Sequence, residues 1–279
     1  MLVSAILVAL VGVLMKKSAD KLVFRAVLSA SSALIVLPFA FFLPLPSQAA
    51  WPYLGAGAIA HFFYQCCYVG AFERGDMSLV YPIMRGVAPA FTAIIAFLFL
   101  RETLLPLEIL GLAIVVCALI AFSWSGRPGG TAQISVIAIA VLCGIFIALY
   151  SVIDAAGMRV SELELGQIWT YLVWFFMLDM IGMSLLVFWR RGKTGILLVI
   201  SEAKYGFLAG TISLVSFSLA LYAFTLAPVA KMSAMRETSV VFGAVFAAWI
   251  LKEPFGRQRI LLAVLLASGL LMLQSGGYD

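Results

Sequence analysis

The chain of 279 residues contains few charged side chains. Asp, Glu, Lys and Arg make up 11% of it and hydrophobic residues make up 64%, and the mean hydropathy is +1.13. Soluble domains carry about 25% charged residues, so this composition excludes an ordinary soluble protein. It predicts a chain that lies in a lipid bilayer.

Histidine, cysteine and catalytic motifs are scarce as well. The single histidine and four cysteines lack metal-ligand spacing, and the cysteines fall within apolar stretches, so neither a metal site nor a disulfide framework is expected. The net charge of +5 comes from short basic clusters that flank apolar segments, which does not indicate nucleic-acid binding. No P-loop, GxGxxG, HExxH or Ser-His-Asp pattern stands out. We therefore expect a protein that is not an enzyme, is not driven by bound nucleotide and needs no cofactor.

Ten apolar segments follow one another along the chain, each about as long as a membrane-spanning helix. Lipid cannot hydrogen-bond the backbone, so each segment is expected to be helical. The predicted fold class is an all-α integral membrane protein with ten transmembrane helices. The segments are 2–17, 22–43, 51–72, 77–100, 105–124, 132–154, 166–189, 204–225, 229–250 and 257–275.

One pattern occurs twice. Arg85 precedes Arg101-Glu102, and Arg236 precedes Lys252-Glu253 at the same spacing, with each arginine inside an apolar run. The two stretches can be aligned with one short gap, which indicates a duplication. Glu102 and Glu253 sit at helix ends, where roles in turns and interfaces are expected, whereas the two arginines lie within spans.

The glycine-rich stretch SWSGRPGGTAQ has the composition of a linker. It divides the chain into a first five-helix repeat, residues 1–125, and a second, residues 132–279. Repeats with an odd number of spans insert in opposite orientations, so we expect two inverted repeats and a binding site at their interface. Basic residues concentrate in the odd-numbered connections, and the positive-inside rule then places both termini outside the cytoplasm.

The third segment carries a polar stripe. His61, Tyr64, Gln65 and Tyr68 follow helical spacing and share one face. Two interpretations remain open, a cavity lining or a row of interhelical hydrogen bonds of the kind common in membrane bundles. As the only histidine, His61 is also a candidate for proton relay.

The fourth segment places Tyr81 and Arg85 one turn apart, with Pro82 and Pro89 on either side of the arginine. Proline bends a helix and frees carbonyl groups, which is tolerated where the backbone lines a cavity or meets another helix. Arg85 is either a binder of carboxylate or phosphate or a member of a structural ion pair. Arg236 is its counterpart in the second half.

Asp179 lies in the middle of the most aromatic segment. An acid inside a span is costly and normally faces the bundle interior. If its protonation changes, transport is coupled to protons; the alternative is a permanent ion pair with Arg85 or Arg236. Protons are thus a candidate coupling ion.

Aromatic residues of the same segment form a surface with two possible roles. Trp169 and Tyr171, near its start, fit bilayer anchors, whereas Trp174 and its neighbours fit a wall for an apolar substrate group. Weaker polar candidates are Tyr150, Asp154, Ser213, Ser216 and Tyr222.

The stretch GDMSLVYPIMRGVAPAFTAIIAFLFLRETLLPLEILGLAIVVCALIAF closely resembles the repeat of the ten-helix drug/metabolite transporter superfamily. The shared features are a proline-bearing fourth helix that ends in Glu102 and a glycine-containing fifth helix from about Leu105. The second half departs from this pattern, since Ser233 and Val240 occupy the positions of the prolines. The chain looks most like the bacterial exporters of amino acids and related metabolites.

This resemblance implies a basket-shaped bundle around a central cavity, with the fifth and tenth helices packed to the side. Many members are described with both termini inside, which conflicts with the charge count. The four-helix multidrug relatives use a carboxylate in their first helix, and the first segment here has none.

We therefore expect a secondary transporter of the bacterial inner membrane that moves small amphiphilic metabolites, above all amino acids including aromatic ones, by alternating access. The alternatives are an exporter of multiple drugs or cationic compounds, a membrane-embedded transferase and a channel. Substrate, direction, coupling and oligomeric state are not determined by the sequence. The expected substrate-binding residues are His61, Tyr64, Gln65, Tyr81, Arg85, Trp174, Asp179, Ser216, Tyr222 and Arg236.

Overall fold

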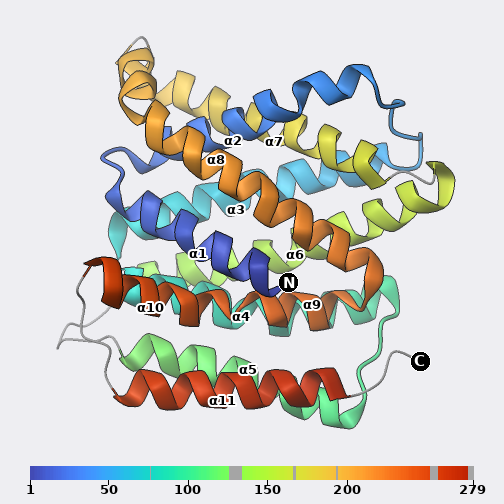
Figure 1. Cartoon of the computed structure of the whole chain (residues 1–279), viewed down its shortest axis with the longest axis vertical. Coiled ribbons are helices and arrows are strands. Elements are labelled where there is room, and N and C mark those ends of the chain that lie inside the picture. Colours follow the sequence, from blue (N-terminus) through green and yellow to red (C-terminus); the bar gives the residue numbers. More distant parts are fainter. Residues whose placement is uncertain (76, 126–133, 166–167, 193, 252–256, 276–279) are drawn as a thin grey trace.

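The computed structural model contains helices and no strand in the part of the chain that it describes (Figure 1). Those residues are 1–75, 77–125, 134–165, 168–192, 194–251 and 257–275. The all-α class is confirmed. The elements are α1 (Leu2–Lys17), α2 (Lys21–Val36), the 3₁₀ helix η1 (Leu37–Phe41), α3 (Trp51–Arg74), α4 (Met77–Leu100), α5 (Pro106–Ser125), α6 (Ile134–Leu165), α7 (Ile168–Arg191), α8 (Thr194–Leu226), α9 (Val229–Arg236), α10 (Ser239–Leu251) and α11 (Arg257–Ser275).

Several helices are suited to a bilayer. Five described helices are long and apolar enough to cross one, and the shorter stretches Pro106–Ala121 and Ile260–Ser275 are also apolar. α6 and α8, with 32 and 33 residues, are longer than predicted. Their additional turns include charged residues such as Arg159 and Glu202, so these helices continue beyond the apolar stretch that predicted them.

The ninth predicted segment, 229–250, is not one helix. α9 ends at Arg236 and α10 begins at Ser239. Between them, the backbone N–H groups of Glu237 and Thr238 donate to carbonyl groups three residues earlier, at 3.1 and 3.3 Å, which is the tighter 3₁₀ pattern. α4, in contrast, continues through both of its prolines. The break therefore lies in the half where no proline or glycine predicts it.

The two halves of the chain interleave. α2 packs against α7 and α8, α3 against α6 and α7, α4 against α6 and α9, and α1 against α8 and α10. Suppose that the first span corresponds to the sixth, the second to the seventh and the third to the eighth. The α3–α6 contact then corresponds to the contact of α8 with α1, and the α2–α8 contact corresponds to that of α7 with α3. The α4–α6 contact likewise becomes that of α1 with α9 and α10. A two-fold relation between the halves predicts such a pattern.

α5 and α11 pair with each other at one side of the bundle, as the family resemblance implied (Figure 1). Glycines allow their backbones to touch. A Cβ atom on Gly111 would lie 2.6 Å from the carbonyl oxygen of Gly269, and one on Gly269 would lie 2.9 Å from that of Gly111. Small residues at such crossings are the usual means of close helix packing in membranes.

Candidate functional site

A cavity of about 40 Å³ lies inside the bundle, between the two halves of the chain. One water needs roughly 10–15 Å³ of such space, so the cavity has room for about three waters and for no metabolite. Side chains from both halves line it: Val8, Val11, Met15, Arg25, Leu28, Ser32, His61, Tyr64, Tyr68, Arg85, Tyr150, Phe175, Phe176, Asp179, Ser213, Phe217 and Arg236.

The charged groups in this wall are mainly basic. Arg25, Arg85 and Arg236 line the cavity and are buried, and among the described residues Asp179 is the one carboxylate in the wall. A concave surface with an excess of one charge raises the local concentration of ligands of the opposite charge. The cavity is therefore suited to a ligand with an anionic group.

Asp179 is held by a hydrogen-bonded network from α2 and α3. Its Oδ1 atom accepts from Gln65 Nε2 at 2.7 Å, and its Oδ2 atom accepts from the Ser29 hydroxyl at 2.9 Å. Arg25 Nε donates to Gln65 Oε1 at 3.0 Å, so the amide connects the guanidinium group to the carboxylate. The predicted alternative of an ion pair with Arg85 or Arg236 is wrong. Arg25 was missed because a basic residue near a span end was assigned to membrane topology.

His61 lies between two carboxylates. Its Nδ1 atom is 3.3 Å from Asp179 Oδ1, and its Nε2 atom is 3.8 Å from Asp154 Oδ2. Asp154 is fully buried and accepts a hydrogen bond from the Tyr171 hydroxyl at 2.9 Å. The polar stripe of α3 thus serves both predicted purposes, since it lines the cavity and bonds to neighbouring helices.

The two predicted arginines differ in their partners. Arg85 Nη1 lies 3.3 Å from Glu237 Oε1, and both side chains are buried. The Arg85 guanidinium group also lies 5.3 Å from the Tyr81 ring, whose hydroxyl donates to Ser239 Oγ at 3.3 Å. In the described part of the chain, Arg236 forms no ion pair; its guanidinium group lies 5.3 Å from the Phe217 ring, and its buried Nε atom has no hydrogen-bond partner.

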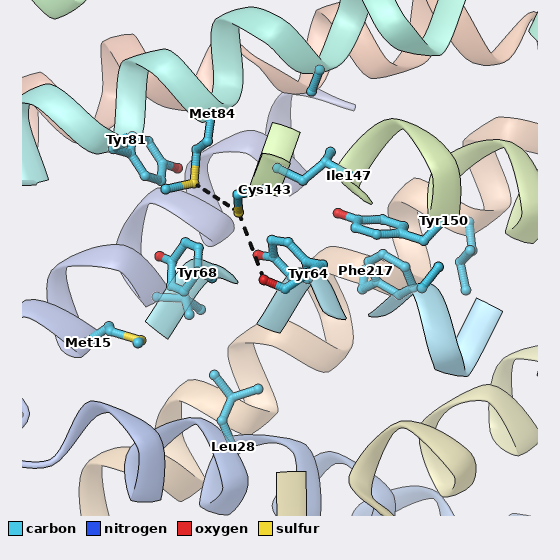
Figure 2. Packing of buried hydrophobic residues seen from close by; sticks show 14 of the residues in the cluster. Met15, Leu28, Tyr64, Tyr68, Tyr81, Met84, Cys143, Ile147, Tyr150 and Phe217 are labelled. Atoms are coloured by element: carbon cyan, nitrogen blue, oxygen red, sulfur yellow. Dashed lines mark hydrogen bonds between the residues drawn. The ribbon is translucent and has the colours of Figure 1, made fainter. Parts of the chain in front are cut away.

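Aromatic rings form much of the surface around these charges. Figure 2 shows Tyr64, Tyr68 and Tyr81 close to Cys143, whose thiol contacts Met84 Sδ at 3.7 Å. Further aromatic contacts surround His61, with centroids 3.9, 4.8 and 5.0 Å away in Tyr150, Phe175 and Phe217. The cavity therefore combines charged groups with flat apolar faces.

Five predicted residues lie outside the cavity wall. Gln65 and Tyr81 contact wall residues, as described above, and the other three do not face the cavity. Trp174 packs against Trp51 with centroids 5.4 Å apart. The Ser216 hydroxyl donates to the carbonyl oxygen of Ser4 at 2.8 Å, which joins α8 to α1. Tyr222 is 45% exposed on the outside of α8. Helical periodicity alone could not distinguish these faces of α7 and α8, because both are apolar.

The anchor interpretation holds for one aromatic residue and fails for another. Trp169 is 56% exposed at the start of α7, as expected of a bilayer anchor. Tyr171 is fully buried and donates to Asp154, so its assignment as an anchor was wrong. Its hydroxyl donates to one oxygen of the acid on α6, a partner that the sequence pattern does not indicate.

At one end of the bundle, Glu102 joins the two halves of the chain. Its Oε1 atom accepts from Arg159 Nη2 on α6 at 2.6 Å, and its Oε2 atom accepts from the backbone N–H of Val229, at the start of α9, at 2.8 Å. This connection lies at the right of Figure 1. The predicted interface role of Glu102 is confirmed, while that of Glu253 lies outside the described residues.

At the opposite end, Glu202 on α8 joins the two halves. Its Oε1 atom accepts from the backbone N–H groups of Ala19 and Asp20 at 2.9 and 3.2 Å. The Asp20 carboxylate also pairs with Arg191 Nη2 at 2.7 Å. These contacts join the α1–α2 connection, at the left of Figure 1, to the second half of the chain. Polar contacts therefore join the two halves of the chain at both ends of the bundle.

Comparison with known proteins matches the first part of the chain to a family. Residues 1–124 match the model of the EamA-like transporter family, within the drug/metabolite transporter superfamily. The match covers nearly all of the predicted first repeat and agrees with the predicted superfamily. Members of that family are transporters of small molecules, and the apolar helices of this chain fit a multi-pass membrane protein.

The fold of the chain has a counterpart among solved structures. One crystal structure superposes with a TM-score of 0.70 at 12% identity, over 97% of this chain and 93% of the other. At that identity the likeness concerns the fold alone. Comparison with curated proteins produced no match.

Proposed function

We propose that this EamA-like transporter carries amphiphilic metabolites, above all amino acids including aromatic ones, across the bacterial inner membrane by alternating access. The observation that carries the proposal is the cavity wall, in which three arginines face one carboxylate beside aromatic rings. The arginines suit a substrate carboxylate, Asp179 suits an ammonium group, and Phe175 and Phe217 suit an apolar side chain.

Arg236 is the strongest candidate for the substrate carboxylate. Its Nε atom is buried without a hydrogen-bond partner among the described residues, and leaving a buried donor unsatisfied costs about 1–3 kcal/mol. A bound carboxylate would remove that cost, because guanidinium and carboxylate groups fit each other bidentately. The proposed direct contacts are His61, Tyr64, Arg85, Asp179 and Arg236.

Two further predicted residues support these contacts. Gln65 orients the Asp179 carboxylate through its amide nitrogen, and Tyr81 lies against the Arg85 guanidinium group. We assign no substrate contact to Trp174, Ser216 or Tyr222.

The proposed architecture is ten transmembrane helices in two inverted repeats, residues 1–125 and 132–279. The exchange pattern of helix contacts supports it, since a two-fold axis in the membrane plane predicts the same pairs. Linker residues 126–133 lie outside the described part of the chain. α9 and α10 together form the ninth span, and a broken helix at a repeat interface is a frequent feature of transporter binding sites.

In alternating access, the Glu102 and Glu202 contacts act as gates at the two ends of the bundle. The cavity is too small for a metabolite, so the described conformation is a closed state between two open ones. Opening at one end requires the Glu102 contacts to break, and opening at the other requires the Glu202 contacts to break. If only one set breaks at a time, the site faces one side of the membrane at a time.

Exchange in proteoliposomes tests this function. Vesicles loaded with an unlabelled amino acid are mixed with the same labelled compound, for a panel of L-phenylalanine, L-tryptophan, L-leucine, L-threonine and L-lysine, with tetraphenylphosphonium as a cationic compound. We expect exchange of the neutral amino acids, because the arginines in the wall repel a ligand that carries only positive charge. Exchange of tetraphenylphosphonium alone would favour the cation exporter instead.

Variants connect any activity to the cavity. Arg236→Ala should reduce exchange at least tenfold, since the loss of one buried charge-assisted hydrogen bond is worth about 1.5–3 kcal/mol. The matched control is Tyr205→Phe, on the exposed surface of α8, which should keep the wild-type rate. Equal rates for Arg236→Ala and wild type would refute the assignment.

A further inference from the structure

The contacts of His61 require more hydrogen atoms than a neutral imidazole carries. Both ring nitrogens face a carboxylate oxygen, at 3.3 Å from Asp179 and 3.8 Å from Asp154. A neutral imidazole has one N–H, so one of its nitrogens presents a lone pair toward a carboxylate. Neither nitrogen forms a hydrogen bond within the described structure, although both are buried. One added proton would give each nitrogen a donor for the oxygen that it faces.

Asp154 supplies an independent reason for a proton at this place. The carboxyl group is fully buried, and its one hydrogen bond in the described chain comes from Tyr171. The only basic side chain within ion-pair distance, among described residues, is His61. Burying an unpaired carboxylate is far more costly than burying a paired or protonated one. The pair of His61 and Asp154 therefore favours holding a proton.

The other ionisable groups near His61 form no ion pair with it among the described residues. Arg25 on α2 is already bonded to Gln65, and Arg236 on α9 lies over Phe217. α8 presents the Phe217 ring to the imidazole and no titratable group among the contacts of the described residues. The remaining ionisable neighbours are Tyr64 on α3, Tyr150 on α6 and Tyr171 on α7.

We propose that His61, held between Asp154 and Asp179, is the proton-binding site through which this transporter is coupled to a proton gradient. The proposal rests on the proposed transport of amino acids. His61 lines the cavity, so its proton can exchange with water whenever the cavity opens to either side. Asp154 is not in the cavity wall and acts only through the imidazole.

The position of the three groups explains how the proton and the substrate are coupled. His61 is on α3 of the first half, and both acids are on α6 and α7 of the second half. The protonated imidazole therefore ties the halves together through two charge-assisted contacts and favours the closed cavity. A substrate ammonium group at Asp179 replaces that charge, and the imidazole releases its proton to the cavity water. If the cavity closes only when it holds a proton or a substrate, one proton is exchanged for each substrate molecule.

The test compares transport with and without a proton gradient in proteoliposomes, with the membrane potential clamped by potassium and valinomycin. The compound is the member of the amino-acid panel that exchanges fastest. A gradient of about one pH unit supports about tenfold accumulation in one-for-one exchange. We expect the wild type to reach it, and Asp154→Asn, which retains an acceptor for the Tyr171 hydroxyl, to show a ratio of driven to undriven accumulation near one. Tyr171→Phe removes the same hydrogen bond but keeps the acid, and should remain coupled.

A second measurement needs no variant. Adding substrate to purified wild-type protein in weakly buffered detergent solution should release about one proton per molecule, followed with a pH indicator. Absence of proton release, or driven accumulation by Asp154→Asn equal to that of the wild type, would overturn the proton site. Wild-type protein that exchanges no amino acid would instead overturn the proposed function, so the two failures are distinguishable.

Discussion

Replacing Glu102 with alanine should open the transporter at one end. The side chain accepts hydrogen bonds from Arg159 and from the first N–H of α9, at 2.6 and 2.8 Å. Arg159 is 32% exposed, so its ion pair is worth only about 0.2–1 kcal/mol. The bond to the helix N-terminus adds about 1–1.5 kcal/mol. Together they contribute about 2 kcal/mol to closure at this end, which corresponds to a roughly 30-fold change in the population of the open state.

Cysteine labelling from one side of the membrane measures that population. Ser213 lines the cavity, so Ser213→Cys in a chain whose four native cysteines are replaced provides a single reporter. A membrane-impermeant thiol reagent is added to only one face of oriented vesicles. Glu102→Ala should increase the labelling rate from one face by about 30-fold if the open population limits the reaction.

Glu202→Ala is the matched variant, because that carboxylate also accepts backbone N–H groups from the other half, at the opposite end. It should increase labelling from the other face. Equal labelling from both faces in either variant, or an increase from the same face in both, would refute the reasoning.

Three other variants probe packing and the corrected assignments. Arg85→Ala leaves Glu237 buried without its cation and should lower stability by about 3–5 kcal/mol, with partial recovery when Glu237→Ala is added; thermal unfolding in detergent measures both. Gly111→Leu should lower the melting temperature by forcing α5 away from Gly269, whereas an unchanged melting temperature would show that the crossing can adapt. Tyr222→Phe should leave exchange within about twofold of the wild type, because surface substitutions usually have small effects; a tenfold loss would return this residue to the site.

The positions of the helices were largely predictable from the sequence. Lipid requires each span to be helical and apolar, so length and hydropathy located the ten segments. Their ends were less predictable, because α6 and α8 continue through residues such as Arg159 and Glu202 that lie outside the apolar stretch. The break after Arg236 was not predicted, since no proline or glycine lies at the end of α9.

The candidate site was partly predictable for a related reason. Charged groups inside apolar runs are rare enough to identify directly, which located Arg85, Asp179 and Arg236. Their partners depend on which helices pack together, and the sequence contains no direct signal for that. Arg25 is connected to Asp179 through Gln65 because α2 and α3 both pack against α7. Tyr171 donates to Asp154 because α6 and α7 are also in contact.

The three arginines around the cavity also bear on the leak of cations across the membrane. A carrier that opens and closes in a membrane under voltage must not let small cations leak through while it turns over. Guanidinium groups cannot lose their charge in proteins, so Arg25, Arg85 and Arg236 present a permanent positive charge that repels sodium and potassium ions in the cavity water. The same residues that would attract a carboxylate would thereby limit the leak of these cations during transport.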